Sequence, residues 1–172
     1  DPVDGTKGFL AFRHYVTAGA LLEEGQATSA VIGAPEFPGY EGGALLYASN
    51  GAARIQPMNG GPNRQMRVSD RSDAATLRAL QSVEKSHVNH DRIAQVRALA
   101  GIPDALVEWA DSQEKYARIA NGDAELYLRL NRISGTRPHY VWDHAPGTVL
   151  VQMAGGKVSD LDGAPLDFSR GR

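Results

Sequence analysis

The first six residues, Asp-Pro-Val-Asp-Gly-Thr, contain two carboxylates separated by a proline and a valine. Because the ring of Pro2 restricts its φ angle, the backbone between Asp1 and Asp4 is held to one course. Two carboxylates that lie close together repel each other, and either protonation of one or a divalent cation between them relieves the repulsion. Oxygen ligands without cysteine favour Mg²⁺, Mn²⁺ or Ca²⁺ over zinc. The segment is therefore a candidate metal site, and an ordinary turn is the alternative.

Gly5 and Thr6 follow the second carboxylate, and their backbone N–H groups would bind phosphate if a helix begins there. A second acidic element lies far along the chain, where Asp143 precedes a predicted helix and could complete a metal cluster. A cation beside an anion-binding turn is typical of phosphoester hydrolases. This interpretation requires the carboxylates of Asp1, Asp4 and Asp143 to converge in the folded protein.

The composition is that of a globular protein. The chain has 172 residues, 42% of them apolar and 22% charged, which is enough for one domain or two small subdomains with a buried core. Its 18 basic and 20 acidic residues give a net charge of −2, so we expect no nucleic-acid polymer as a partner. The sequence contains no cysteine, which excludes disulfides and a cysteine nucleophile. With no apolar run of membrane-spanning length, we expect a soluble, cytoplasmic protein without a membrane partner.

Two β-hairpins are predicted in the first third of the chain. Residues 14–32 are rich in branched and aromatic side chains around the Glu24-Gly25 pair, and residues 43–55 surround Asn50-Gly51. Asn-Gly favours the positive φ angles of a tight hairpin turn. Four strands in this order predict an antiparallel meander. Residues 56–73, rich in Gly, Pro and Asn, are predicted to be a loop and the boundary between two subdomains.

The second half alternates predicted helices and strands, an order typical of a parallel or mixed sheet with helices around it. A helix capped by Asn89 or His90 would end at Gly101, and residues 105–110 would form a strand. Asp111 lies three residues before Glu114, the spacing of a capping box that opens a helix ending at Gly122. In the first of these helices, the expected buried face consists of Ile93, Val96 and Leu99. A further helix is predicted within residues 142–155, with Pro146 tolerated in its first turn. Its expected buried face consists of Val149, Leu150 and Met153.

Residues 125–130 alternate as a strand does. Leu126, Leu128 and Leu130 would face one side, and Tyr127 and Arg129 the other. The five donors of an arginine guanidinium suit bidentate binding of a phosphate. Arg129 is therefore a candidate anion-binding residue, with an exposed strand position as the alternative.

Five sequence motifs, in order along residues 1–172, resemble those of one enzyme family. DPVDGT and WDHAPG are similar to the paired signatures of the lithium-sensitive, magnesium-dependent phosphatases related to inositol monophosphatase. Further stretches resemble the 3′(2′),5′-bisphosphate nucleotidase branch of this family. They are VEKSH, DSQEKY, GDAELYLRL, VWDHAPGTVLVQMAGGKVSDLDGAPLDF and the closing GR. The resemblance implies an α+β or α/β fold, a layered α-β-α-β sandwich of the sugar-phosphatase type. Residues 1–68 would be the remainder of an N-terminal metal-binding subdomain, and residues 69–172 a C-terminal α/β subdomain that contacts the nucleotide.

The resemblance also assigns roles to individual residues. Two or three Mg²⁺ ions, or Mn²⁺, would bind the carboxylates of Asp1, Asp4 and Asp143 and the carbonyl of Val3. Thr6, together with Asp4, would orient or deprotonate the attacking water, and the Gly5 and Thr6 amides would hold the scissile phosphate. The implied nucleotide contacts are His87, Ser112, Lys115 and Arg129, of which the cationic ones would bind a second phosphate. The alternatives are a structural role for His87 and a solvated helix position for Lys115.

The activity implied is a Mg²⁺-dependent phosphomonoesterase. It would remove the 3′-phosphate of adenosine 3′,5′-bisphosphate to give AMP, by in-line attack of water, with 3′-phosphoadenylyl sulfate as a further candidate substrate. Residues 11–14 depart from the family's Gly-, Glu- and Gln-containing turn. This departure leaves an inositol-phosphate phosphatase open as an alternative, and a non-catalytic nucleotide-binding fragment is another.

Family members extend beyond both ends of this sequence and carry a metal-binding glutamate before the first motif. We therefore expect a central and C-terminal part of a longer phosphatase, in which the N-terminal helices and strands of the fold are missing. Such a part would have little activity alone, and adding the upstream segment would restore turnover. Its exposed apolar surface would pair with that N-terminal segment or with another copy of the chain.

Overall fold

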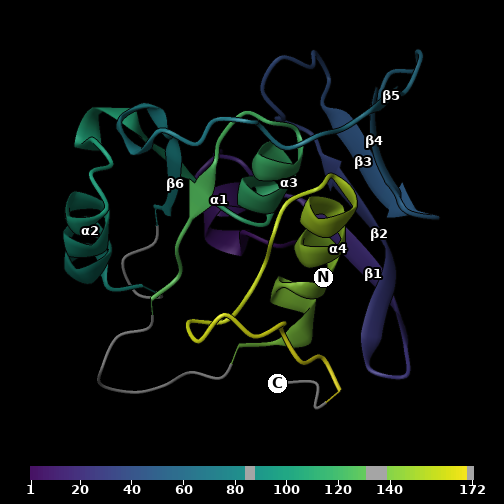
Figure 1. The fold of residues 1–172 in the computed structure, drawn as a ribbon. Helices are drawn as coiled ribbons and strands as arrows, with labels where there is room; N and C mark the ends of the chain where they lie inside the picture. The colour runs from purple at the N-terminus through teal and green to yellow at the C-terminus, as the bar shows by residue number, and fades with distance from the viewer. Residues whose placement is uncertain (84–87, 131–138, 170–172) are drawn as a thin grey trace.

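The first half of the chain forms an antiparallel sheet in the computed structural model, which describes residues 1–83, 88–130 and 139–169 (Figure 1). Its strands are β1 (Thr17–Glu23), β2 (Gln26–Ala34), β3 (Ala44–Ser49), β4 (Ala52–Pro57) and β5 (Arg64–Gln65), in that order across the sheet. Both predicted hairpins are confirmed. Glu24 and Asn50 have φ angles of 50° and 51°, and the glycine after each also has a positive φ.

The fifth strand lies within residues 56–73, which the sequence predicted to be a loop throughout. Two residues, Arg64 and Gln65, pair with Ile55 and Arg54 of β4, and Met66 beside them is fully buried. A two-residue strand is too short to produce an alternating pattern, so composition alone could not reveal it. A 3₁₀ turn, η1 (Ala74–Thr76), follows before the second sheet.

The second sheet consists of parallel strands, as the alternation of helices and strands predicted. Its order is β7 (Val107–Ala110), β6 (Ala79–Ser82), β8 (Leu126–Tyr127), and β6 pairs with both neighbours in parallel. Helix α2 (His90–Leu99) and turn η2 (Asp104–Leu106) connect β6 to β7, and helix α3 (Glu114–Ala120) connects β7 to β8. Strand β8 covers only two of the residues predicted at 125–130.

Helix α2 buries a different face from the one predicted. The Asn89 side chain caps the helix by accepting a hydrogen bond from Arg92 N at 3.1 Å, as expected. Ile93 is buried, but Val96 is 41% and Leu99 90% exposed. The second buried residue is Arg97, whose guanidinium donates to the Gln81 side chain of β6 and to Asp104. The buried face of α2 is therefore determined by the side-chain partners of Arg97. The spacing of apolar residues along the helix does not reveal these partners.

The start of helix α3 also differs from the prediction. The helix begins at Glu114, and the side chain of its N-cap, Gln113, makes no capping hydrogen bond. Asp111 instead accepts a hydrogen bond from Arg13 Nε at 2.8 Å. The predicted capping box is therefore wrong, because a tertiary ion pair uses the carboxylate.

Helix α4 (Ala145–Met153), which follows turn η3 (Val141–Asp143), joins the two sheets into one layered structure. It begins with Pro146 in its first turn, as predicted, and buries Val149 and Leu150, with Met153 partly buried. Figure 1 shows α4 and α3 between the five-stranded sheet and the β6 side of the molecule, with α2 outermost. The layers alternate between sheet and helix, which confirms the predicted fold class.

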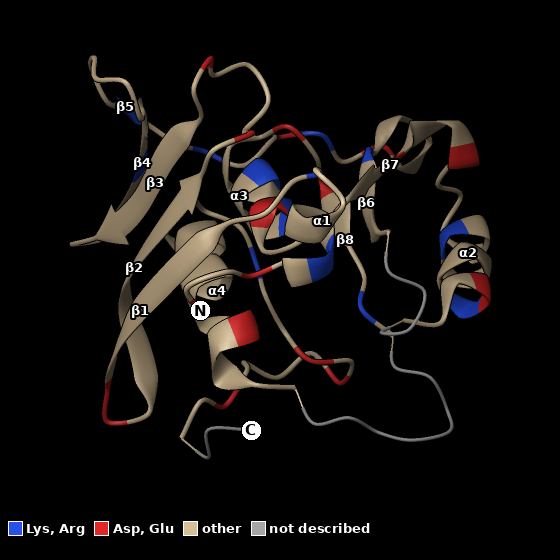
Figure 2. Cartoon of the chain, turned by 180° about the vertical axis from the view of Figure 1, so that it is seen from behind, with Lys and Arg blue, Asp and Glu red and all other residues tan. Residues whose placement is uncertain are grey.

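Charged residues are distributed over several elements. In the view of Figure 2, basic and acidic residues are interspersed on α2 and α3, whereas the strands of the five-stranded sheet are largely uncharged. In the part of the chain that the structure describes, none of the helices has the length and apolar character required to cross a bilayer.

Candidate metal and anion site

A cavity of about 290 Å³ lies where α1 (Thr6–Leu10), the β7–α3 junction, β8 and η3 meet. Every predicted site residue in the described part of the chain lines it: Asp1, Val3, Asp4, Gly5, Thr6, Ser112, Lys115, Arg129 and Asp143. His87 lies outside the described residues. The structure therefore brings residues of the first motif, DPVDGT, and Asp143 of the WDHAPG motif into one pocket.

The three predicted acidic ligands converge. Asp1, Asp4 and Asp143 each offer a carboxylate oxygen, and these oxygens lie within 4.8 Å of one another. All three residues are half-buried. An all-oxygen set of this kind suits a hard divalent cation, and this is the arrangement that the sequence interpretation required.

The backbone of the first motif is fixed against strand β1 and the residue before it. Asp4 N donates to Val16 O at 2.8 Å, and Val16 N donates back to Asp4 O at 3.0 Å. Within the motif, Val3 N donates to Asp1 Oδ1 at 3.1 Å. Gly5, with a φ of 85°, is the N-cap of α1 and turns the chain into that helix. The predicted helix start is therefore present at the proposed phosphate site.

Thr6 lies at the first position of α1, and its hydroxyl donates to the Val3 carbonyl at 3.1 Å. This bond leaves the lone pairs of the hydroxyl oxygen free to accept a hydrogen bond from a water. The Val3 carbonyl, with two lone pairs, can accept this bond and still contact a cation.

Burial raises the pKa of the Asp4 carboxyl, and the nearby Asp143 raises it further. A hydrogen bond from Gln113 and the positive charge of Lys115 oppose the increase. The ionised Asp4 is thus poorly stabilised by the protein alone. A bound divalent cation would relieve the repulsion between Asp4 and Asp143 and favour ionisation of Asp4.

Lys115 is buried, so it is not a solvated helix charge. Its ammonium donates to Ala110 O at 3.2 Å and Ser112 O at 2.7 Å, and lies 5.3 Å from the centre of the Tyr127 ring. Because an ammonium has three donors, one remains for a ligand in the cavity. Ser112, which has a φ of 57°, also accepts a hydrogen bond from Glu114 N through its side chain.

Arg129 lines the cavity two residues after Tyr127. Among the described residues, its buried Nε has no hydrogen-bond partner. A guanidinium N–H without a partner at a cavity wall can bind an anion. Arg129 lies beyond the end of β8, and the neighbouring Leu130 packs against Val88 and Ile93.

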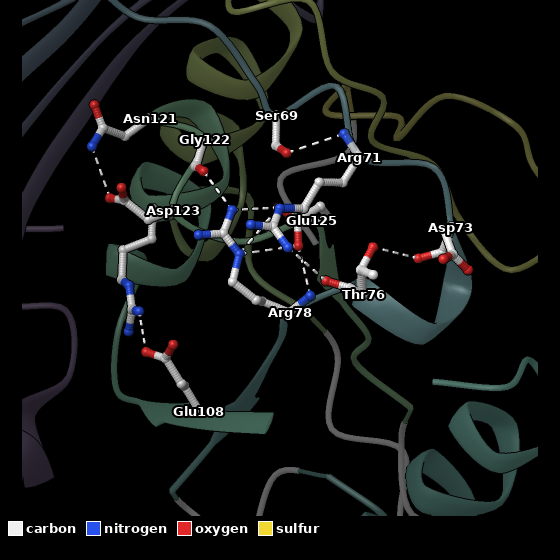
Figure 3. Close-up of polar contacts among 11 residues, drawn as sticks. Ser69, Arg71, Asp73, Thr76, Arg78, Glu108, Asn121, Gly122, Asp123 and Glu125 are labelled. Carbon is white, nitrogen blue, oxygen red and sulfur yellow. Dashed lines mark hydrogen bonds and ion pairs between the residues drawn. The ribbon is translucent and has the colours of Figure 1, made fainter. Parts of the chain in front are cut away.

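A polar network anchors the start of β8, the strand that precedes Arg129 (Figure 3). Glu125 accepts hydrogen bonds from the backbone N and the guanidinium of Arg78, and Arg78 also donates to the Gly122 carbonyl at 2.7 Å. In return, Leu126 N donates to Arg78 O at 3.2 Å. These bonds fix the beginning of β8 against the residue preceding β6.

An ion pair and a hydrogen bond connect the turn at residues 11–14 to the start of α3. Arg13 pairs with Asp111, and His14 Nδ1 lies 2.6 Å from Glu114 Oε2. Burial raises the pKa of Glu114, and His14 opposes that increase. The turn that departs from the family pattern thus has two acidic partners beside the cavity.

Several cavity residues were not predicted from the sequence: Lys7, Gly8, Ser82, Asp111, Gln113, Tyr116 and Tyr127. Asp111, Gln113 and Tyr116 lie in the motif DSQEKY, and Tyr127 lies in GDAELYLRL, but the resemblance assigned no role to them. Gln113 is buried, and its backbone N–H donates to Asp4 Oδ2 at 2.6 Å. Buried side chains such as Tyr116 and Gln113 resemble ordinary core positions in sequence, so their location depends on the fold.

Comparison with known proteins gives matches over the whole chain. The model of the inositol monophosphatase family matches residues 1–172. A curated relative named 3′(2′),5′-bisphosphate nucleotidase 1, from Candida albicans, is 34% identical and covers 100% of this chain and 52% of its own length. The Arabidopsis thaliana protein named probable 3′(2′),5′-bisphosphate nucleotidase 4 is 37% identical, over 99% of this chain and 50% of its own. The chain thus spans about half the length of these relatives.

Solved structures share the fold. Mycobacterium tuberculosis SuhB has a TM-score of 0.71 at 18% identity and covers 95% of this chain and 62% of its own. CysQ from Bacteroides thetaiotaomicron has a TM-score of 0.65 at 24% identity, over 90% of this chain and 58% of its own. Because the family's model matches every residue, this chain belongs to the inositol monophosphatase family.

Proposed function

We propose that the chain forms the metal- and nucleotide-binding part of a Mg²⁺-dependent phosphomonoesterase. The substrate would be adenosine 3′,5′-bisphosphate, with 3′-phosphoadenylyl sulfate as a further candidate. The observation that carries the proposal is that three acidic ligands and the cationic side chains of Lys115 and Arg129 line one cavity. The names of the curated relatives support the choice of a bisphosphate nucleotide over other phosphate esters.

The residues around the cavity suggest a division of roles. The carboxylates of Asp1, Asp4 and Asp143 and the Val3 carbonyl would hold the ions, which supply charge stabilisation and a more acidic water when bound. The Thr6 hydroxyl would orient the attacking water, and the amides of Gly5 and Thr6 at the start of α1 would hold the scissile phosphate.

Lys115 and Arg129 would bind the second phosphate of the nucleotide. Lys115 retains one free donor after its two bonds to backbone carbonyls, and the Nε of Arg129 has no hydrogen-bond partner among the described residues. A substrate with only one phosphate would leave these cations without a partner. Discrimination between bisphosphate and monophosphate nucleotides would therefore depend on this pair.

The test compares adenosine 3′,5′-bisphosphate with adenosine 3′-monophosphate, which lacks the second phosphate, in the presence of Mg²⁺. Arg129→Gln should raise the Kd for the bisphosphate, measured by calorimetry, about 10- to 100-fold, the loss of one charge-assisted contact, and leave the Kd for the monophosphate unchanged. Arg54→Gln, on β4 outside the cavity lining, is the matched control.

Equal effects of Arg129→Gln on both substrates would contradict the role of Arg129. Faster phosphate release from inositol 1-phosphate than from the nucleotide would favour the inositol-phosphate alternative. Calorimetric binding of the nucleotide without phosphate release would indicate a binding fragment instead of a catalyst.

A further inference from the structure

The side chain of Gln113 connects two elements that carry the acidic ligands. Its Nε2 donates to Trp142 O at 2.9 Å, and its Oε1 accepts from Gly147 N at 3.0 Å. Trp142 immediately precedes Asp143, and Gly147 lies in the first turn of α4. Together with the bond from Gln113 N to Asp4 Oδ2, one residue thus contacts both sides of the acidic cluster.

We propose that Gln113 is a positioning residue that sets the placement of Asp143 relative to Asp4 and thereby the affinity of the cluster for a divalent cation. The inference rests on the metal site of the proposed function. Asp4 and Asp143 lie on different elements and come from opposite ends of the chain, and no hydrogen bond between them is present in the described structure. Gln113 connects them, because its backbone N–H binds Asp4 and its side chain binds Trp142 and Gly147 at the η3–α4 junction.

An amide is required at this position because it must donate to one partner and accept from the other. The Trp142 carbonyl needs a donor, and the Gly147 N–H, one of the free donors at the start of a helix, needs an acceptor. Glutamate at this position would place an acceptor against the Trp142 carbonyl. Methionine would keep the volume but leave both backbone groups without these bonds, and the η3–α4 junction would lose this connection to the start of α3.

The test is Mn²⁺ binding measured by electron paramagnetic resonance on the unmodified chain and its variants, with urea unfolding measured in parallel. Gln113→Met should weaken Mn²⁺ binding about 10- to 100-fold, the usual effect of losing a group that orients a metal ligand. Gln81→Met is the matched control: Gln81 is equally buried, and its side-chain oxygen binds Arg97 outside this cavity. The control should lose stability and keep its Mn²⁺ affinity.

Unchanged Mn²⁺ affinity in Gln113→Met, or an equal loss in Gln81→Met, would overturn the inference. Should Gln113→Met fail to fold, Gln113→Asn decides the question. This variant retains the amide but is one methylene too short for both bonds, so weaker Mn²⁺ binding supports the inference and unchanged binding overturns it. If the unmodified chain binds no Mn²⁺, or Asp143→Asn binds it equally well, the proposed metal site fails instead.

Discussion

His144, next to a proposed metal ligand, is a buried histidine that the fold keeps neutral. The Tyr116 hydroxyl lies 2.7 Å from its Nδ1, and His139 Nδ1 lies 2.8 Å from its Nε2. Burial, with the positive charge of Arg129 and the proximity of His139, lowers the pKa of His144 to about 3. The side chain therefore binds Tyr116 and His139 by hydrogen bonds without carrying a charge at neutral pH.

This arrangement predicts a pH dependence of stability. The unfolded chain protonates this histidine near its ordinary pKa of 6.5, whereas the folded chain resists protonation until about pH 3. Stability from this group is thus present above pH 6.5 and is lost as the pH falls through the interval between these values. At pH 5 the loss should be about 2 kcal/mol.

The measurement is urea unfolding of the unmodified chain and of His144→Asn at pH 7 and pH 5. The variant should lose about 2 kcal/mol less between the two pH values because it has no group to protonate. His90→Asn is the control, since His90 is also a partly buried histidine but packs on Trp109 away from the cavity. Equal pH dependence in the unmodified chain and His144→Asn would contradict this account.

At the scale of elements, the close approach of α3 and α4 positions the acidic cluster. Gly147 of α4 lies against the ring of Tyr116 of α3, and a Cβ built at Gly147 would lie 2.3 Å from Tyr116 Cγ. Because Tyr116 is buried against Tyr127 and His144, the ring has no free direction in which to move. Glycine is therefore required for the distance between the two helices.

Gly147→Ala should lower the free energy of unfolding by about 1–3 kcal/mol through overpacking. It should also weaken Mn²⁺ binding, since η3 with Asp143 would move together with α4. Gly19→Ala is the matched control: at Gly19 in β1, an added Cβ would meet only Val31 Cγ1 at 3.7 Å, an ordinary contact. Unfolding in urea measures the first effect, and a Gly147→Ala chain as stable as Gly19→Ala would show that the helices can separate.

At the scale of the whole molecule, the main apolar core is built from both halves of the chain. Strands β1 to β4 contribute residues such as Ile32 and Leu46, α3 contributes Ala117, and α4 contributes Leu150. The division into a metal-binding subdomain of residues 1–68 and a nucleotide-contacting subdomain of residues 69–172 stays a prediction. Energetically, neither part can bury its apolar face without the other.

We therefore expect one cooperative unfolding transition. Both tryptophans, Trp109 and Trp142, lie in the second half, so their fluorescence reports only on that half. Amide hydrogen exchange in β2 and β3 reports on the first sheet. The two probes should give the same free energy of unfolding, and a first sheet that exchanges with much lower protection than fluorescence indicates would contradict the shared core.

Sequence alone determined the local features. The Glu24-Gly25 and Asn50-Gly51 turns, the Asn89 cap and the parallel order of the second half all depend on neighbouring residues or on the order of elements, and all were predicted correctly. The acidic residues of the cluster were also identifiable, because residue type and the family motifs indicate them directly.

Only the tertiary structure decided which partners these residues meet. The buried Arg97, the use of Asp111 by Arg13 in place of a helix cap, and the burial of Lys115 depend on residues distant in sequence. The position of Gln113 between Asp4 and the residue before Asp143 is of the same kind. The periodicity of apolar residues in a helix or strand indicates which positions face the interior. Which polar groups these positions then contact depends on how the elements pack.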